Sequence, residues 1–398
     1  MSNIDVWPQE WVESEGQITV GAVIEQPGES RRCLWYRLPA DLRSAITHIA
    51  NPFVAGVLFT ALRNGGRMTV HGDVSPSLLQ NIDEFQSAWV AWRPKVYRRI
   101  EIVAEREREP PVAEKDLAVM TFSGGVDSSF TAWRHHNGQA GRRKYDLRSG
   151  VFLHGFDIPL DRQTEFDRAA ERARRMLESI GMDFIPLATN FRQFRGDWED
   201  VHGAMLASCL MLLQGRYRIG LIASGFSYSY LVFPYGSNPM TDVMFSSDAF
   251  RIIHHGAGFN RLEKTREVAK WPEVSKYVRV CWQGEDLSRN CCRCQKCVAN
   301  MLFFRMVGLP RMECFPKNIS NFDIIRMRYP DIEMIKSMQR ILAVACDLHI
   351  KDSWVLVLRA SVILNRLNWR LQRIFRPVLR IYKRLIGRRA KKRAQPQP

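Results

Sequence analysis

The chain has 398 residues, 46% of them hydrophobic, so it is long enough for two or three domains and apolar enough to bury a core. Its first 17 residues are too polar for a secretory signal peptide, and no apolar run reaches transmembrane length. Of the formal charge of +17, most lies in residues 351–398, which carry 14 Lys and Arg and one Asp. The charge therefore does not indicate a nucleic-acid surface on the first 350 residues.

Residues 1–110 are expected to form a small α+β region of their own, and no catalytic pattern is visible in it. Alternating or β-rich segments predict strands at 17–24, 33–38, 67–71 and 96–104. Apolar periodicity predicts helices at 51–62 and 75–92. Residues 105–114 are charged and contain Pro110-Pro111, which is typical of a linker.

From residue 115 to about 280, predicted strands and helices alternate, which is typical of an α/β protein with a doubly wound parallel sheet. The strands are expected at 117–122, 150–154, 183–187 and 219–224, and helices at 164–180 and 200–213. Ligands of such sheets bind at the carboxyl ends of the strands. This rule gathers four segments around one crevice: 123–129, 154–157, Asn190 and 224–226.

The segment after the first of these strands has the composition of a phosphate-binding loop. Two glycines allow an anion to approach the backbone, and the first N–H groups of the following helix point toward it. Serine hydroxyls add donors, whereas Asp127 is explained by a bound Mg²⁺ or by helix capping. The same spacing also suits an ordinary strand-to-helix turn with a serine-rich cap. The residues of the loop are Ser123, Gly124, Gly125, Val126, Asp127, Ser128 and Ser129.

The string SGGVDSS resembles the PP-loop of the N-type ATP pyrophosphatases, a family that cleaves ATP between the α and β phosphates. The resemblance implies the fold of the adenine nucleotide alpha hydrolases, and ATP with Mg²⁺ bound at this loop. The segment is not a Walker A loop, because the chain contains no Gly-Lys pair.

Within that superfamily, the chain resembles the 7-cyano-7-deazaguanine synthases over residues 115–305. Leu153, His154 and the following glycine resemble the segment that lines their adenosine pocket, and Gly225 falls in the same crevice. The segment 261–268 resembles the one whose lysine, here Lys264, reaches the ATP phosphates. The family's acidic substrate loop is not clearly present, and residues 235–248 stand in its place. Four residues of this loop region are candidates for binding the substrate or a metal, although each is more simply explained as a turn residue or a cap. They are Asp242, Asp248, His254 and His255.

Four of the nine cysteines lie between residues 291 and 297, which in a chain without a secretory signal indicates a metal site and a reducing, cytoplasmic location. Two overlapping C-x-x-C units and one upstream cysteine supply four thiolates for tetrahedral zinc. Cys292 is too close in sequence to its neighbours to share the metal easily. An iron–sulfur cluster is an alternative. The 7-cyano-7-deazaguanine synthases have the same arrangement as a structural zinc site. The expected ligands are Cys281, Cys291, Cys294 and Cys297.

Residues 306–398 are expected to be helical, with a basic amphipathic tail from 354 to 386. Apolar residues at helical spacing form one side of the tail and arginines the other. Three interpretations stay open: a helix packed on the body, a helix that binds an anionic membrane surface or a protein partner, and a nucleic-acid tail, the last not favoured. The membrane interpretation would make the protein peripheral at the inner membrane surface.

Together these patterns predict an ATP-dependent ligase or synthase with Asp127 and Lys264 as catalytic residues. Such an enzyme would adenylate a carboxylate or carbonyl oxygen of a small-molecule or other carboxylate-bearing substrate, release pyrophosphate and transfer a nitrogen nucleophile. The alternatives are a tRNA-modifying thiolase of the PP-loop class and a non-catalytic nucleotide-binding protein with a zinc module. The sequence identifies neither the acceptor nor the nitrogen donor.

Overall fold

The computed structural model describes residues 3–194, 196–329 and 332–371. By internal contacts the chain divides into two compact units. The first comprises residues 1–291 and 312–314, and the second comprises residues 292–311 and those from 315 onward. Among the described helices, none is both long and apolar enough to cross a membrane.

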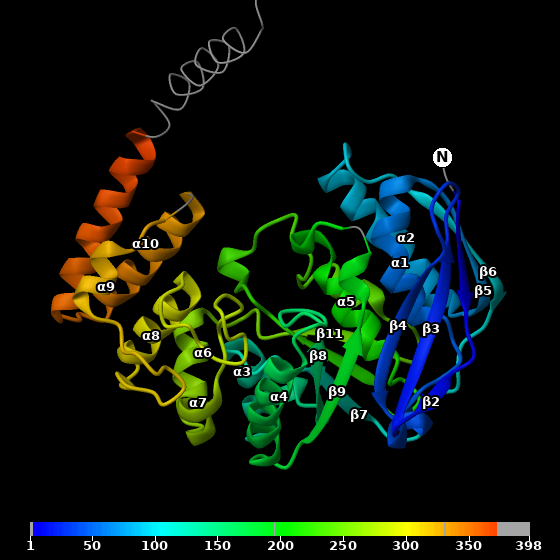
Figure 1. Ribbon diagram of the computed structural model, residues 1–398, viewed down its shortest axis with the longest axis horizontal. Helices are drawn as coiled ribbons and strands as arrows, with labels where there is room; N and C mark the ends of the chain where they lie inside the picture. Colours follow the sequence, from blue (N-terminus) through cyan, green and yellow to red (C-terminus); the bar gives the residue numbers. More distant parts are fainter. Residues whose placement is uncertain (1–2, 195, 330–331, 372–398) are drawn as a thin grey trace, which may run out of the picture. The chain divides into compact units, whose positions relative to one another are not determined.

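The first unit is built on one eleven-stranded, mostly parallel sheet flanked by helices (Figure 1), an α/β architecture compatible with a Rossmann-like fold. Its order is β11-β10-β7-β8-β9-β4-β3-β1-β5-β6, with β2 paired to β3. The strands are β1 (Ile4–Pro8), β2 (Val12–Ser14), β3 (Gln17–Glu25), β4 (Arg32–Pro39), β5 (Gly66–Val74), β6 (Ile100–Glu107), β7 (Leu117–Thr121), β8 (Asp146–His154), β9 (Asp183–Thr189), β10 (Ile219–Ala223) and β11 (Arg251–His255). The helices are α1 (Asn51–Asn64), α2 (Pro76–Trp92), α3 (Val126–His136), α4 (Gln163–Glu178), α5 (Trp198–Met211), α6 (Arg261–Val268) and α7 (Pro272–Tyr277).

The parallel strands β11, β10, β7, β8 and β9 form a doubly wound half-sheet, as predicted. Successive crossovers run from β7 to β8 to β9, and the chain then returns to β10 on the other side of β7. The helices α3 and α4 pack against β8, whereas α5 packs against β7 and β10. The order of the strands therefore reverses between β7 and β10, and the carboxyl ends of these two strands form the switch point where ligands bind in such folds.

The strands of residues 1–110 continue this sheet. Strand β4 pairs antiparallel with β9, where Tyr36 lies opposite Thr189 and Arg37 opposite Ala188. Figure 1 shows β4 and β9 side by side. The core is shared as well, because Ser208 on α5 bonds both the Tyr36 hydroxyl and the Pro52 carbonyl at the start of α1. The N-terminal strands and the doubly wound strands therefore bury one continuous apolar core.

Both predicted ends of the last strand in this region are wrong, since its start lies at Ile100 and not at residue 96. The strand expected at 96–104 is observed as β6, which extends to Glu107 and so takes in the first residues of the segment interpreted as a linker. Among the strands that the structure describes, β6 pairs only with β5, so it is an edge strand, and its residues 105–107 are exposed. An edge strand tolerates charged side chains, and composition alone therefore misplaced its end.

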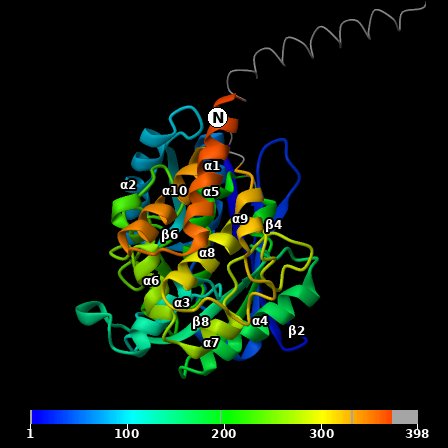
Figure 2. The same ribbon diagram turned by 90° about the vertical axis from the view of Figure 1, so that its left-hand side faces the viewer.

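The second unit is helical. It contains α8 (Gln295–Met306), α9 (Asn321–Arg326), α10 (Ile332–Asp347) and a last helix that the structure describes over residues 353–371. α8 and α10 pack on each other, and Figure 2 shows these helices from a second direction. The amphipathic tail predicted for 354–386 is helical in its described part, and its positions beyond 371 lie outside the described residues.

Candidate functional site

The loop 123–129 lies at the switch point and has the expected strand–turn–helix form. Phe122 still donates its N–H to the Val151 carbonyl of β8, and α3 begins at Val126. Between them Gly124 has φ +70°, a left-handed conformation that glycine adopts without strain. The first N–H groups of α3 have no acceptor within the helix, so the turn presents donors and the positive end of the helix dipole. This arrangement favours an anion at the loop.

Asp127 is held by two cations from α6. Its Oδ2 accepts a hydrogen bond from an Arg261 Nη2 at 2.9 Å, and its Oδ1 accepts one from Lys264 Nζ at 3.1 Å. Lys264 also donates to the Ser224 carbonyl at 2.5 Å and is only 2% exposed. The helix that carries both cations starts with a capping box between Asn260 and Glu263. Lys264 thereby connects the loop after β7 with the end of β10.

The charges at this point favour binding of a further anion. Burial opposes ionisation of Asp127, but Arg261 and Lys264 outweigh it and lower the pKa of the carboxyl group. Burial lowers the pKa of Lys264, with the Asp127 carboxylate acting in the opposite direction. One carboxylate faces two cations, so the site carries an excess of positive charge beside the helix start. A polyphosphate matches that excess.

A cavity of about 230 Å³ opens next to the loop. Its lining combines polar and charged residues, among them Ser123, Asp127 and Ser128, with apolar and aromatic ones. Trp198 and His202 are four residues apart and so share one side of α5. Such a mixture of a few polar groups and aromatic walls is typical of a small-molecule site. The other lining residues are Thr121, Phe122, Val151, Phe152, Leu153, Phe156, Asp157, Leu206, Ala223 and Arg279.

Arg279 is a residue of this cavity that the sequence did not identify. Its backbone N–H donates to the Gly124 carbonyl at 2.9 Å, which fixes the turn of the loop. Its guanidinium is buried, donates to the Cys281 carbonyl at 2.8 Å and lies 3.7 Å from the Asp157 carboxylate. Burial lowers its pKa, and Asp157 partly compensates. Nothing in the segment around Arg279 marks it as a site residue, since only the fold places it beside residues 123–128.

Of the three residues expected in an adenosine pocket, Leu153, His154 and Gly225, only the first lines the cavity. His154 is buried on a different side, where its Nε2 bonds the Pro159 carbonyl at 2.9 Å and its ring stacks on Phe166. Gly225 follows Ser224 directly but is not a lining residue. Asn190 holds β4, because its amide bonds the backbone of residues 33 and 35.

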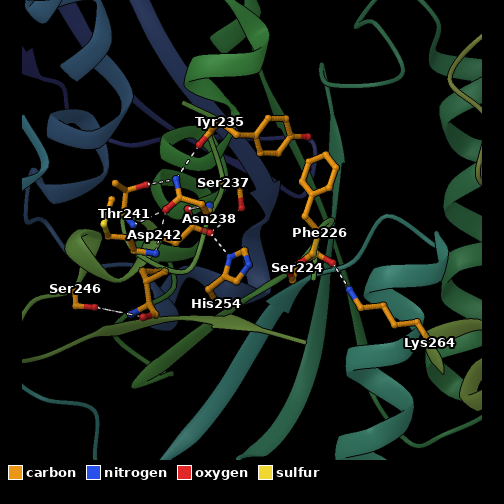
Figure 3. A network of polar contacts seen from close by, with 12 residues as sticks. Ser224, Phe226, Tyr235, Ser237, Asn238, Thr241, Asp242, Ser246, His254 and Lys264 are labelled. Atoms are coloured by element: carbon orange, nitrogen blue, oxygen red, sulfur yellow. Dashed lines mark hydrogen bonds and ion pairs between the residues drawn. The ribbon is translucent and has the colours of Figure 1, made fainter. Parts of the chain in front are cut away.

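The loop that replaces the acidic substrate segment is organised around Asp242 (Figure 3). The Asp242 carboxylate accepts from the Ser237 hydroxyl at 2.7 Å and from the Asn238 N–H at 3.2 Å, and pairs with His254 Nδ1 at 2.8 Å. Both Asp242 and His254 are buried. These three contacts explain Asp242 and His254 as residues that hold the loop onto β11. Asp248 is exposed, and its backbone N–H donates to Ser77.

The four predicted zinc ligands form one cluster. The sulfurs of Cys281, Cys291, Cys294 and Cys297 all lie within 4.8 Å of one another, and Cys292 is not among them. Sulfurs around tetrahedral zinc stand about 3.8 Å apart, because Zn–S bonds measure about 2.3 Å. The Cys297 N–H donates to Cys294 Sγ at 3.4 Å, and the Gln283 N–H donates to Cys281 Sγ at 3.3 Å. Such N–H donors stabilise thiolates, so the cluster could hold a metal ion such as zinc.

Comparison with protein-family models, with curated proteins and with solved structures gave no match for this chain. The evidence for the fold class and for the possible metal cluster therefore comes from the structure alone. The kinship with PP-loop enzymes stays a prediction.

His255 leads to a prediction about pH. Burial, then His135 and nearby cations, lower its pKa from 6.5 to about 3. As the pH falls through about 6.5, His255 is protonated in the unfolded chain but stays neutral in the folded chain. The free energy of unfolding therefore falls as the pH drops below that value. We expect this residue to account for a loss of about 2 kcal/mol between about pH 7 and about pH 5.

Chemical unfolding at the two pH values measures this loss. The variant His255→Asn keeps a hydrogen-bonding partner for Thr131. Its free energy of unfolding is expected to fall less than that of the parent chain over the same pH interval. Protonation of the other titratable groups lowers the stability of both chains equally. Equal losses in the two chains would contradict the prediction.

Proposed function

We propose that the protein is an ATP-dependent ligase or synthase that cleaves ATP between the α and β phosphates. The observation that carries the proposal is the contact of Asp127, in the first turn of α3 directly after the glycine turn, with Lys264 and Arg261. This cluster stands at the switch point of a doubly wound sheet. The resemblance of residues 123–129 to the PP-loop points in the same direction. No Walker lysine is present to draw charge toward a γ-phosphate.

In the proposed reaction, an oxygen of the acceptor carboxylate attacks the α-phosphorus. The bond from that phosphorus to the bridging oxygen breaks, and pyrophosphate leaves with the bonding electrons. A nitrogen nucleophile then attacks the activated carbonyl carbon, AMP departs, and the nitrogen loses a proton. The loop donors and the two cations would stabilise negative charge that develops on the departing pyrophosphate. Trp198, His202 and Phe156 would enclose the acceptor or the adenine in the adjoining cavity.

Two metals fit the residues present. A carboxylate has about four lone-pair sites, so Asp127 has room for Mg²⁺ besides its two present partners. Mg²⁺ there would neutralise phosphate charge. Zinc held by the four cysteines would be structural, because a closed four-thiolate site leaves no open position for chemistry.

The product of ATP cleavage tests the proposal. The protein is incubated with Mg²⁺ and ATP labelled at the α-phosphorus, with a mixture of aliphatic, aromatic and amino-acid carboxylates and with hydroxylamine as the nitrogen nucleophile. Labelled AMP and a hydroxamate are expected. Labelled ADP as the main product would refute the proposal. Failure of α,β-methylene-ATP to bind, measured by calorimetry, would refute the nucleotide site itself.

A further inference from the structure

The helix over residues 353–371 exposes an apolar face. Five large aliphatic side chains on it are between 50% and 66% exposed. Their spacings of three, four, seven and eight residues bring them to one side of a helix. Soluble surfaces normally carry such side chains singly. The five are Leu356, Ile363, Leu364, Leu367 and Leu371.

The opposite face of this helix holds it in the second unit. Trp354, Leu358 and Val362 are buried there. On the same face Asn365 accepts a hydrogen bond from the Tyr329 N–H at 3.0 Å and donates to the Met327 carbonyl at 2.9 Å. The helix is therefore fixed by one side, and its exposed leucines are not needed for that packing.

The charged residues that this helix itself carries all have one sign. Arg359, Arg366 and Arg370 are exposed, and no Asp or Glu occurs from residue 353 to the last residue of the sequence. In the same 46 residues the sequence has 13 Lys and Arg. An apolar helix face bordered by arginines complements a layer with an apolar interior and anionic headgroups.

We infer that this helix docks the protein on an anionic lipid surface, lying in the plane of the interface. A nucleic acid would match the arginines but would leave the aliphatic face in water. Symmetric contact between two copies would cover the leucines but would bring like-charged arginine rows together. Lipid accounts for both features at once. The inference does not depend on the ATP reaction, because none of these residues belongs to the cavity or the cysteine cluster.

Sedimentation with vesicles tests the inference on the full chain. Wild type is expected to bind vesicles of phosphatidylcholine mixed with phosphatidylglycerol, and to bind pure phosphatidylcholine much more weakly. Replacing Arg359, Arg366 and Arg370 together by Gln should weaken binding on the order of a hundredfold at low salt, since each basic residue near an anionic surface contributes roughly fivefold. The double variant Ile363→Glu with Leu367→Glu should lower binding at least about tenfold at any salt concentration.

Val12→Glu is the matched control for the glutamate variants. Val12 is 60% exposed on β2 of the first unit, so the change introduces one of the two added negative charges at a similarly exposed apolar position away from the helix. It should bind vesicles as wild type does. Circular dichroism and thermal unfolding of each variant check that its fold is kept.

Three results would overturn the inference. The first is absence of vesicle binding by wild type at low salt. The second is binding that the glutamate variants leave unchanged. The third is a wild-type dimer in light scattering that the same variants convert to monomer, which would assign the apolar face to a second copy of the chain.

Discussion

Asp127→Asn is expected to lower ATP cleavage by at least about a hundredfold, because a charge that organises the phosphate site typically contributes a few kcal/mol to the transition state. Asparagine keeps the size of the side chain but removes the charge that pairs with Lys264 and Arg261. The two cations then face each other without the carboxylate between them, and Mg²⁺ loses its proposed ligand. Single-turnover assays with α-labelled ATP measure the effect.

The control for this variant is Asp248→Asn, which makes the same chemical change at an exposed aspartate of the 235–248 loop. It is expected to retain activity close to that of the parent. Metal content of the Asp127→Asn protein should be unchanged, since the cysteine cluster involves other residues. An Asp127→Asn protein with parental turnover would remove this carboxylate from the mechanism.

Cys294→Ser is expected to abolish metal binding and to destabilise the fold severely. Structural zinc contributes on the order of 10 kcal/mol of apparent binding energy to small domains, and much of it is lost when one thiolate is missing. Cys294 also caps α8, where its sulfur accepts from the Cys297 N–H. Elemental analysis of the purified protein measures bound metal, and thermal unfolding measures stability.

Cys292→Ser provides the comparison, because this thiol lies in the same segment but outside the group of four. It should keep about one zinc per chain and unfold at nearly the parental temperature. A chelator added to the parent protein should reproduce the instability of Cys294→Ser. Visible absorbance and iron in protein purified without oxygen would show a cluster of iron and sulfur in place of zinc.

The local features of the site could be predicted from sequence because each is encoded within a few residues. The turn of 123–129 follows directly from glycines between an apolar strand and a helix, and its form is confirmed. The cysteine group follows from C-x-x-C spacing, and the structure brings the four sulfurs together as expected. That ATP binds at the turn stays a prediction.

The contacts that join distant segments could not be predicted in this way. Arg279 reaches the loop only because its backbone bonds Gly124, 155 residues earlier, and no motif surrounds it. The segment 261–268 can be singled out from the sequence, but helical spacing does not reveal that the Arg261 guanidinium meets Asp127. The pairing of β4 with β9 joins residues about 150 positions apart.

The helix over residues 353–371 shows a second kind of feature that hydrophobic periodicity cannot predict. Its apolar stripe was visible in the sequence, but periodicity does not say which side of a helix is buried. The buried side contains Ser361 and Asn365, which are polar and yet satisfied by hydrogen bonds with Tyr329. Polar residues with partners can thus occupy the packed side while leucines face outward.

The pairing of β4 with β9 also limits where the chain can be divided. A fragment that started near residue 112 would keep the proposed ATP-binding strands, but it would uncover the hydrogen-bonding edge of β9. Exposed strand edges recruit other strands, and such a fragment is expected to aggregate. It would also uncover the apolar side of α5 that α1 covers. The N-terminal strands are therefore expected to protect the half-sheet of β11, β10, β7, β8 and β9 from self-association, a task that requires no binding-site residue of their own.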